Sequence, residues 1–315
     1  MRERENLAIR IVLEITLAIR LDFTENVRMI RRVFFIGTLV AFLAAPTFAQ
    51  TNESSFKPNH RDIEYGEAGG EKLLLDAHVP DGDGPFPMLL LVHGGGWSAG
   101  DKEGDLATVL SPAITNFTWF TINYRLAPKH RWPACFDDVQ TAICWVKKHA
   151  ADYKGDPNRL ALIGYSAGGH LVCYAATEAT PETRVQAVVG FAPPTDIVSD
   201  AERRRSMDKW PSMKNLLDRD TLDAETKRIM REISPSEHVT SNLPPFLLVQ
   251  GSADTTVPYH LTQNFESELK AHNVPCKFIT IEGAQHRIRD WKKYRPGWQN
   301  EVVAWLNQTL DAKSK

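Results

Sequence analysis

The pentapeptide G-Y-S-A-G at residues 164–168 is the first segment of this sequence whose residue types suggest chemistry. It follows the apolar run 160–163 and precedes a segment rich in small residues, a pattern typical of a sharp turn from a strand to a helix. Such a turn exposes the serine hydroxyl, while the glycines let the strand and helix approach closely. Ser166 is therefore the candidate nucleophile. The alternative is a glycine-rich turn with a bystander serine.

A run of glycines stands earlier in the chain, in the segment H-G-G-G-W at residues 93–97, directly after an apolar run. Serial glycines let backbone N–H groups turn toward a ligand, because no Cβ stands in the way. In acyl transfer, such donors hold the developing oxyanion together with the N–H that follows the nucleophile. We predict an oxyanion hole at Gly95, Gly96 and Ala167, with Gly94 as the near alternative. A tight loop without a ligand is the other interpretation.

A serine hydroxyl needs a general base, and three histidines lie late enough in the chain to supply one. His260 opens the predicted helix 258–272, only six residues after Asp254, the candidate acid, and His272 ends that helix. His286 lies in a loop after a predicted strand, where it can reach over Ser166. We therefore predict that His286 is the general base and then the general acid, whereas surface positions suit the other two histidines.

The acid of such a triad should follow a strand between the serine and the histidine. Asp254 does so, in the segment G-S-A-D after the apolar run 246–250. It would accept the Nδ1–H of His286, fix the tautomer and stabilise the imidazolium. Glu282 and Asp196 are weaker candidates, and a simple turn residue is the alternative role for Asp254.

Apolar runs alternate with segments of helical spacing along most of the chain. We expect strands at 72–79, 88–92, 117–123, 160–164, 185–191, 246–250 and 277–281, and helices at 133–148, 166–176, 258–272 and 300–310. This alternation predicts an α/β fold with a mostly parallel central sheet and helices on both faces. The polar segment 195–241 interrupts the pattern. We interpret it as a small cap insertion over the site, the alternative being a surface excursion without a substrate role.

Four motifs in fixed order resemble the acetyl esterase/lipase group of α/β hydrolases. They are G-Y-S-A-G-G at 164–169, H-G-G-G-W at 93–97, Y-R-L-A-P at 124–128 and D-T-T-V-P at 254–258. The group includes hormone-sensitive-lipase-like enzymes and bacterial esterases acting on acetylated or feruloylated plant polysaccharides. The resemblance covers residue 60 to the C-terminus. It implies the α/β-hydrolase fold and a triad of Ser166, Asp254 and His286.

The same resemblance implies that His93, Tyr124 and Arg125 support the oxyanion loop without doing chemistry, and that His170 is structural. Tyr165 stands where the lipase-like enzymes usually carry Asp, and Trp97 replaces their Phe or Tyr. The H-G-G-x-W pattern also resembles kynurenine formamidases. These departures favour the polysaccharide-esterase branch.

The expected function is that of a serine carboxylic-ester hydrolase acting on short-chain acyl esters. We expect it to deacetylate or deferuloylate a plant polysaccharide or oligosaccharide through an acyl-enzyme. The alternatives are an arylformamidase-like amide hydrolase and a catalytically inactive binding module on the same scaffold.

The N-terminal region has the pattern of a secretory signal: Arg31 and Arg32, the apolar run 33–45, then the small-residue site T-F-A at 47–49. The apolar run is shorter than the about 20 residues of a membrane span, although an uncleaved anchor is the alternative. We interpret residues 1–28 as a mis-called extension, 29–49 as the signal peptide and 50–315 as the mature hydrolase domain. The mature protein would be periplasmic or secreted, without a stable membrane span.

A formal net charge of -2 gives no electrostatic reason to expect nucleic acid as a partner. The chain has no C-x-x-C or H-E-x-x-H motif, so we expect no metal and no cofactor. Export would permit disulfides among four cysteines. Cys135 and Cys144 share a predicted helix and lie roughly 13 Å apart, too far for a bridge. A Cys144–Cys173 bridge and four free thiols remain open.

Overall fold

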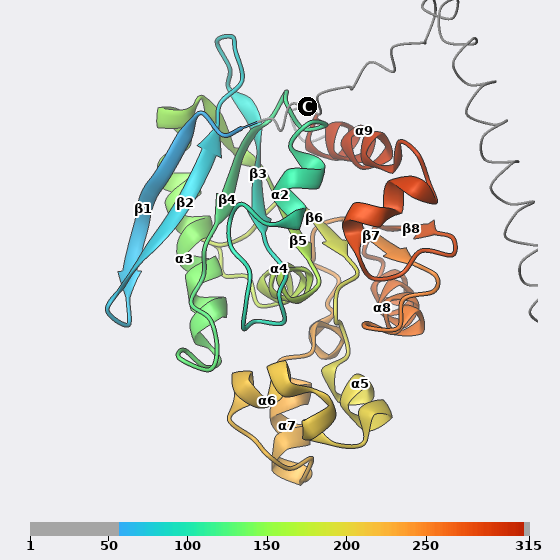
Figure 1. Ribbon diagram of the computed structural model, residues 1–315. Helices are drawn as coiled ribbons and strands as arrows, with labels where there is room; N and C mark the ends of the chain where they lie inside the picture. Colours follow the sequence, from blue (N-terminus) through green and yellow to red (C-terminus); the bar gives the residue numbers. More distant parts are fainter. Residues whose placement is uncertain (1–56, 312–315) are drawn as a thin grey trace, which may run out of the picture. The chain divides into compact units, whose positions relative to one another are not determined.

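Eight strands form a single sheet in residues 57–311, the part of the chain that the computed structural model describes (Figure 1). Their order across the sheet is β1-β2-β4-β3-β5-β6-β7-β8. The bounds are β1 His60–Ala68, β2 Glu71–His78, β3 Phe86–Val92, β4 Thr118–Ile122, β5 Gly155–Tyr165, β6 Ala187–Phe191, β7 Phe246–Gly251 and β8 Cys276–Ile281. The β1–β2 and β2–β4 pairs are antiparallel and the remaining pairs are parallel, as the alternating sequence pattern predicts.

The central strands are continuous apolar runs because both of their faces are covered. Every residue of β4, β6 and β7 is buried, as are the last five residues of β3. The register of the parallel strands brings the ends of β3, β5, β6, β7 and β8 to one edge of the sheet. Loops that leave this edge therefore lie close together, and they carry Gly95, Gly96, Ser166, Asp254 and His286.

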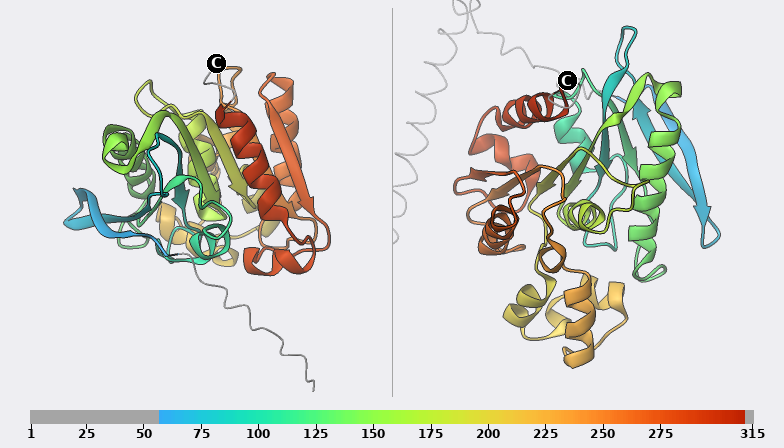
Figure 2. Two further views of the ribbon diagram at one scale, coloured as in Figure 1. Left: turned by 90° about the horizontal axis from the view of Figure 1, so that it is seen from above. Right: turned by 180° about the vertical axis from the view of Figure 1, so that it is seen from behind.

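Helices cover both faces of the sheet (Figure 2). One hydrophobic cluster contains side chains of α3 (Ala134–Lys148), α4 (Ala167–Thr177) and α8 (Tyr259–Ala271). A second cluster, on the other face, contains side chains of α2 (Asp105–Leu110) and α9 (Trp298–Asp311). The sheet is thus the middle layer of three, in agreement with the predicted fold class.

The segment between β6 and β7 folds into short helices that lie together beyond one end of the sheet (Figure 1). They are α5 Ile197–Arg204, η2 Met207–Lys209, α6 Pro211–Leu217, α7 Ala224–Glu232 and η3 Pro235–His238. The carboxylates of Asp196 and Asp223 cap the N-termini of α5 and α7 by accepting from the amides of Ser199 and Thr226. We call residues 195–241 the cap.

The sequence pattern misses β1, an edge strand. Of its nine residues only Tyr65 is buried, so it has no apolar run to reveal it. All four cysteines are free, which removes the open Cys144–Cys173 bridge; Cys144 is exposed and Cys173 is buried. None of the helices between residues 57 and 311 combines the length and apolar character that crossing a membrane demands. The proposed extension and signal peptide, residues 1–49, lie outside the described residues.

Candidate active site

The turn from β5 into α4 holds Ser166 in a strained conformation, with φ 54° and ψ -119°. Its backbone is fixed from both sides, since its N–H donates to the carbonyl of Phe191 at 2.9 Å and its carbonyl accepts from His170 at 2.9 Å. A Cβ on Gly168 would lie 2.1 Å from the carbonyl oxygen of Val92. The glycine is therefore what allows α4 to start directly against β3, with the serine at the edge of the sheet.

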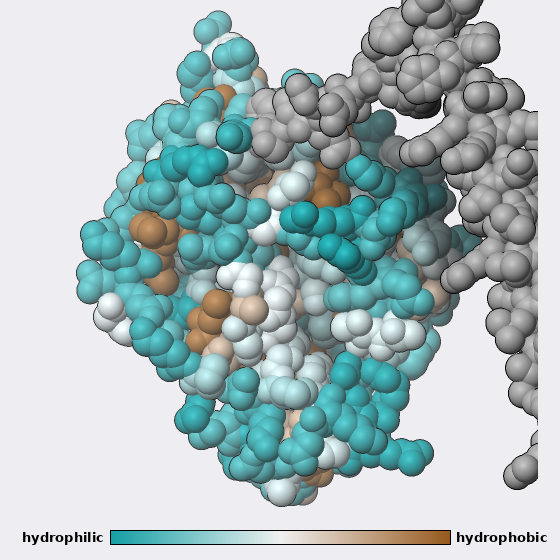
Figure 3. Space-filling view, viewed as in Figure 1, coloured by the Kyte–Doolittle hydropathy of each residue, from teal (hydrophilic) through white to brown (hydrophobic). Residues whose placement is uncertain are grey.

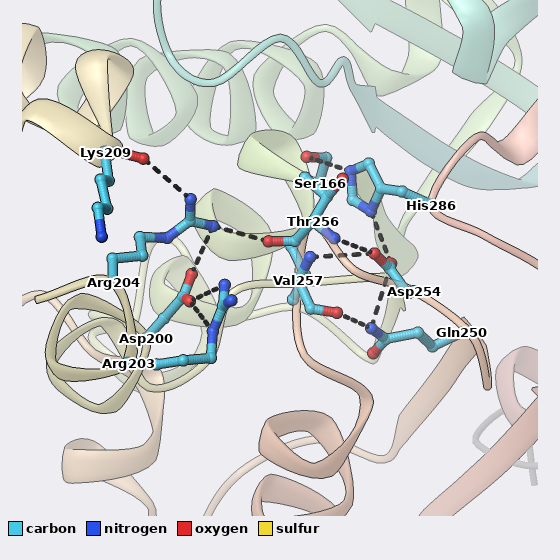
Figure 4. A network of polar contacts seen from close by, with 10 residues as sticks. All are labelled: Ser166, Asp200, Arg203, Arg204, Lys209, Gln250, Asp254, Thr256, Val257 and His286. Carbon is cyan, nitrogen blue, oxygen red and sulfur yellow. Dashed lines mark hydrogen bonds and ion pairs between the residues drawn. The ribbon is translucent and has the colours of Figure 1, made fainter.

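Three side chains meet at this edge in a hydrogen-bonded row (Figure 4). Nε2 of His286 lies 2.9 Å from Oγ of Ser166, and Nδ1 of His286 lies 2.7 Å from Oδ2 of Asp254. His286 comes from the loop after β8 and Asp254 from the loop after β7. Because an ionised carboxylate can only accept, Nδ1 carries the imidazole proton and Nε2 can receive the proton of the serine hydroxyl.

Asp254 is held as a buried acceptor. Its side chain is fully buried, and its Oδ1 accepts from the backbone amides of Thr256 at 2.8 Å and Val257 at 3.0 Å. Gln250 on β7 donates to the other carboxylate oxygen at 3.3 Å and to the carbonyl of Val257 at 2.7 Å. These donors hold the carboxylate in place, and no lysine or arginine between residues 57 and 311 forms an ion pair with it, so Oδ2 can accept from the imidazole.

The glycine loop lies beside the nucleophile. A Cβ on Gly94 would stand 3.2 Å from Cβ of Ser166. Gly95 and Gly96 have φ angles of +123° and +59°, which favour glycine, and a Cβ on Gly95 would be 2.0 Å from a backbone oxygen. Among the described residues, no backbone carbonyl accepts from the amides of Gly95 or Gly96. Ala167 is the first residue of α4, where N–H groups have no intrahelical acceptor.

These groups line a pocket of about 470 Å³ between the sheet edge and the cap. In Figure 3 a pale surface of intermediate hydropathy lies above the mostly hydrophilic surface of the cap. The cap contributes Asp200, Arg204, Trp210 and Ser212 to the lining. The cap segment therefore contacts the candidate site directly, which the sequence could suggest only from its position and length.

Of the three predicted supports, His93 and Tyr124 contact each other at the start of the glycine loop, and Arg125 follows Tyr124 in the chain. His93 stacks on Tyr124 with ring centroids 4.2 Å apart, and the Tyr124 hydroxyl donates to the carbonyl of His93 at 3.0 Å. Arg125 forms an ion pair with the buried Asp138 at 2.7 Å, which fixes this segment on α3. Burial lowers the pKa of His93, so its ring stays neutral and its Nδ1–H can donate to the carbonyl of Gly94 at 2.7 Å.

His170 connects the loop to the cap. The indole Nε1–H of Trp97 donates to its Nδ1 at 3.2 Å, and its Nε2 donates to the carbonyl of Ile233 at 2.7 Å. Complete burial lowers the pKa of His170 to about 4, because desolvation disfavours the charged ring. A neutral ring with one donor and one acceptor is what these two contacts need.

The other candidates lie away from the pocket. His260 is exposed on α8, and His272 contacts the carbonyl of Glu268. Glu282 accepts from the hydroxyl of Ser252, and Asp196 caps α5. Sequence reasoning missed the roles of residues such as Gln250, Arg204 and Trp210, since nothing in their local pattern marks them as neighbours of the triad.

A family model described as BD-FAE matches residues 75–269 of the chain. The chain belongs to the BD-FAE family. The matched region contains the glycine loop, the Ser166 turn and Asp254, so the BD-FAE similarity covers most of the candidate site. His286 lies beyond it.

Curated relatives extend the similarity of this BD-FAE protein. Esterase LipC of Mycobacterium tuberculosis is 35% identical over 273 residues, which are 82% of this chain and 67% of LipC. The probable carboxylic ester hydrolase LipM of the same organism is 33% identical over 240 residues, 71% of this chain and 55% of LipM. The chain thus spans between about half and two thirds of the length of these relatives.

A solved structure shares the fold. The acetyl ester-xyloside bifunctional hydrolase of Caldicellulosiruptor lactoaceticus aligns with a TM-score of 0.67 at 22% identity, covering 79% of this chain and 97% of that one. This BD-FAE protein therefore has the α/β-hydrolase fold expected from its motifs.

Proposed function

We propose that this BD-FAE protein is a serine carboxylic-ester hydrolase. The observation that carries the proposal is the hydrogen-bonded row from Asp254 through His286 to Ser166, beside the amides of Gly95 and Gly96, for which the described part of the chain offers no backbone acceptor. Nε2 of His286, 2.9 Å from the hydroxyl, can act as a general base, and the two glycine amides can receive a developing oxyanion. The named activities of LipC and LipM support the same chemistry.

The proposed reaction has two steps. Oγ of Ser166 attacks the ester carbonyl carbon while its proton passes to Nε2 of His286, and the amides of Gly95, Gly96 and Ala167 stabilise the oxyanion. The intermediate collapses, the bond to the alcohol oxygen breaks, and His286 returns the proton to the leaving alcohol. Water then attacks the acyl-serine with the same base, which releases the carboxylic acid and restores the serine.

We further propose short acyl groups on a carbohydrate, with deacetylation or deferuloylation of a plant polysaccharide or oligosaccharide as the reaction. The pocket lining mixes aromatic rings, Trp97 and Trp210, with the carboxylates of Asp101 and Asp105. Carboxylates can accept hydrogen bonds from sugar hydroxyls, and the apolar surfaces can contact ring carbons. The fold shared with the acetyl ester-xyloside hydrolase supports this choice.

The test is a substrate panel on the purified protein. It compares 4-nitrophenyl esters from acetate to octanoate, acetylated xylooligosaccharides, methyl ferulate and N-formylkynurenine, with Ser166→Ala as the blank. We expect the acetyl esters to be cleaved fastest and a fluorophosphonate to label the native protein but not Ser166→Ala. Preference for N-formylkynurenine would identify an arylformamidase. Absence of both turnover and labelling would identify an inactive binding module.

Export remains a separate proposal, supported by the sequence pattern of residues 29–49. N-terminal sequencing of protein recovered outside the cytoplasm tests it. A mature chain that begins near Gln50 is expected, and one that begins well before it would contradict cleavage of the signal.

A further inference from the structure

Arg204, the last residue of α5, extends from the cap to the loop that carries Asp254 (Figure 4). Its Nη2 donates to the backbone carbonyl of Thr256 at 2.8 Å and to the carboxylate of Asp200 at 3.1 Å. Its Nη1 donates to the carbonyl of Lys209 at 3.3 Å. The guanidinium also lies over the ring of Trp210, 4.5 Å from its centroid. Two hydrogen bonds and the contact with the Trp210 ring hold the guanidinium within the cap, and the hydrogen bond to Thr256 crosses to the loop after β7.

The contact with Thr256 is one peptide group away from the triad. The carbonyl of Thr256 and the N–H of Val257 belong to the same peptide group, and that N–H donates to Oδ1 of Asp254 at 3.0 Å. A cation bonded to a peptide oxygen polarises the group and strengthens the hydrogen bond that its N–H donates. A series of hydrogen bonds thus connects Arg204, through the peptide group between Thr256 and Val257, to the carboxylate of Asp254.

Within the cap, Asp200 holds the guanidinium of Arg204 in place. Asp200 is buried, with a side-chain exposure of 2%, and pairs with both Arg203 and Arg204. Arg203 binds Oδ1 of Asp200 and is 43% exposed, whereas Arg204 binds Oδ2 and is only 18% exposed. Of the two arginines, Arg204 is thus the one that crosses to the main domain, and Arg203 is its matched neighbour.

We infer that Arg204 is a positioning residue: its contact between the cap and the loop after β7 fixes the orientation of the Asp254 carboxylate. The inference rests on the proposed esterase function, in which Asp254 must orient His286. A loop that carries Asp254 has a fixed anchor in Gln250 on β7 and a second anchor on the cap. When the cap anchor is lost, the carboxylate keeps its position less well and the imidazole follows it.

The competing role for Arg204 is direct binding of an anionic substrate, because it lines the pocket. The two roles differ in what they change. A positioning residue acts on the rate of the chemical step for every ester, so its loss lowers kcat. A binding residue acts on anionic esters alone, so its loss raises KM for those.

The experiment compares Arg204→Met, Arg204→Lys and the control Arg203→Met with the wild-type protein. Each is assayed on 4-nitrophenyl acetate and on an anionic hemisuccinate ester, and melting temperature and the rate of fluorophosphonate labelling are measured alongside. A substitution far from the reacting atoms that misplaces a catalytic group can lower the rate by up to about 10²-fold. We therefore expect Arg204→Met to lower kcat by about 10-fold or more on both esters, with little change in KM. Labelling should slow in parallel.

Arg204→Lys should recover part of kcat, because an ammonium can still donate to Thr256 and Asp200. Arg203→Met should keep kcat within about twofold, as expected for an exposed ion pair. Unchanged kcat and labelling in a folded Arg204→Met would overturn the inference, as would an effect confined to KM for the hemisuccinate or an equal loss in Arg203→Met. If the wild-type protein itself neither turns over nor labels, the proposed function fails and this inference fails with it.

Discussion

The hydroxyl of Tyr165 donates a hydrogen bond to the main-chain carbonyl of His286 across 3.0 Å, and the two rings stack with their centroids 5.3 Å apart. The residue before the nucleophile therefore holds the loop that carries the proposed base. Burial raises the pKa of Tyr165, so its hydroxyl stays protonated and remains a donor. This contact gives a structural reason for the tyrosine at a position where the sequence departs from the lipase-like pattern.

Removal of the Tyr165 hydroxyl should slow catalysis, because the loop that carries His286, the proposed base, loses a hydrogen bond that holds it. We expect Tyr165→Phe to lower kcat by up to about 10-fold and the free energy of unfolding by about 1 kcal/mol, the range for one hydrogen bond. The matched control is Tyr259→Phe, which removes a hydroxyl that contacts Thr280. The control should lose similar stability, measured by urea unfolding, and keep kcat. Equal kcat in Tyr165→Phe and wild type would show that the backbone alone places His286.

The buried carboxylate of Asp254 should control the tautomer of His286. Asp254→Asn preserves the shape but offers an amide that can hold the imidazole with the wrong nitrogen protonated, so we expect kcat to fall by about 10⁴-fold. Glu282→Gln is the control, because that side chain contacts Ser252 and not the histidine. Steady-state kinetics on 4-nitrophenyl acetate measure both. A loss of less than tenfold in Asp254→Asn would argue against the proposed acid.

The sequence predicts the central strands well because their burial on both faces requires continuous apolar runs. The expected strand 246–250 corresponds to β7, Phe246–Gly251, and the expected helix 133–148 to α3, Ala134–Lys148. Residues that follow parallel strands gather at one sheet edge, so chain order and loop position suffice to bring Ser166, Asp254 and His286 together.

The contacts of the cap could not be predicted in the same way. The side chain of Arg204 meets a backbone carbonyl 52 positions later in the chain, and backbone groups leave no mark in the sequence. The edge strand β1 was missed for a related reason, since one buried residue gives no periodic signal. Local pattern identifies what is buried in the sheet but not which loop a surface helix contacts.

The four free thiols should differ sharply in reactivity. Cys144 is exposed, whereas burial raises the pKa of Cys135 to about 12 and also raises that of Cys173. The thiolate is the reactive form, so we expect Cys144 to react first with Ellman's reagent in the native protein and all four to react after unfolding. Cys144→Ser should remove the fast phase. Fewer than four thiols in the unfolded, unreduced protein would reveal a disulfide.

His170 should make the protein less stable in acid. Its pKa is lowered from 6.5 to about 4, so between these values the unfolded chain binds a proton that the folded chain does not. Stability conferred by the neutral ring is therefore complete above about pH 6.5 and falls with pH through this window, by on the order of 3 kcal/mol in total. Urea unfolding of the wild type from pH 7.5 to pH 4.5 measures this loss.

The variant that isolates the effect is His170→Gln, because an amide can still accept from Trp97 and donate to Ile233 but does not titrate. Its free energy of unfolding should depend less on pH across the window than that of the wild type, whatever its value at neutral pH. Some dependence should remain, since burial also lowers the pKa of His93. His260→Gln, an exposed change on α8, should keep the wild-type slope. Identical slopes for His170→Gln and wild type would mean that the buried ring takes up a proton in the folded protein as readily as in the unfolded chain, which requires the hydrogen bond from Trp97 to Nδ1 to break.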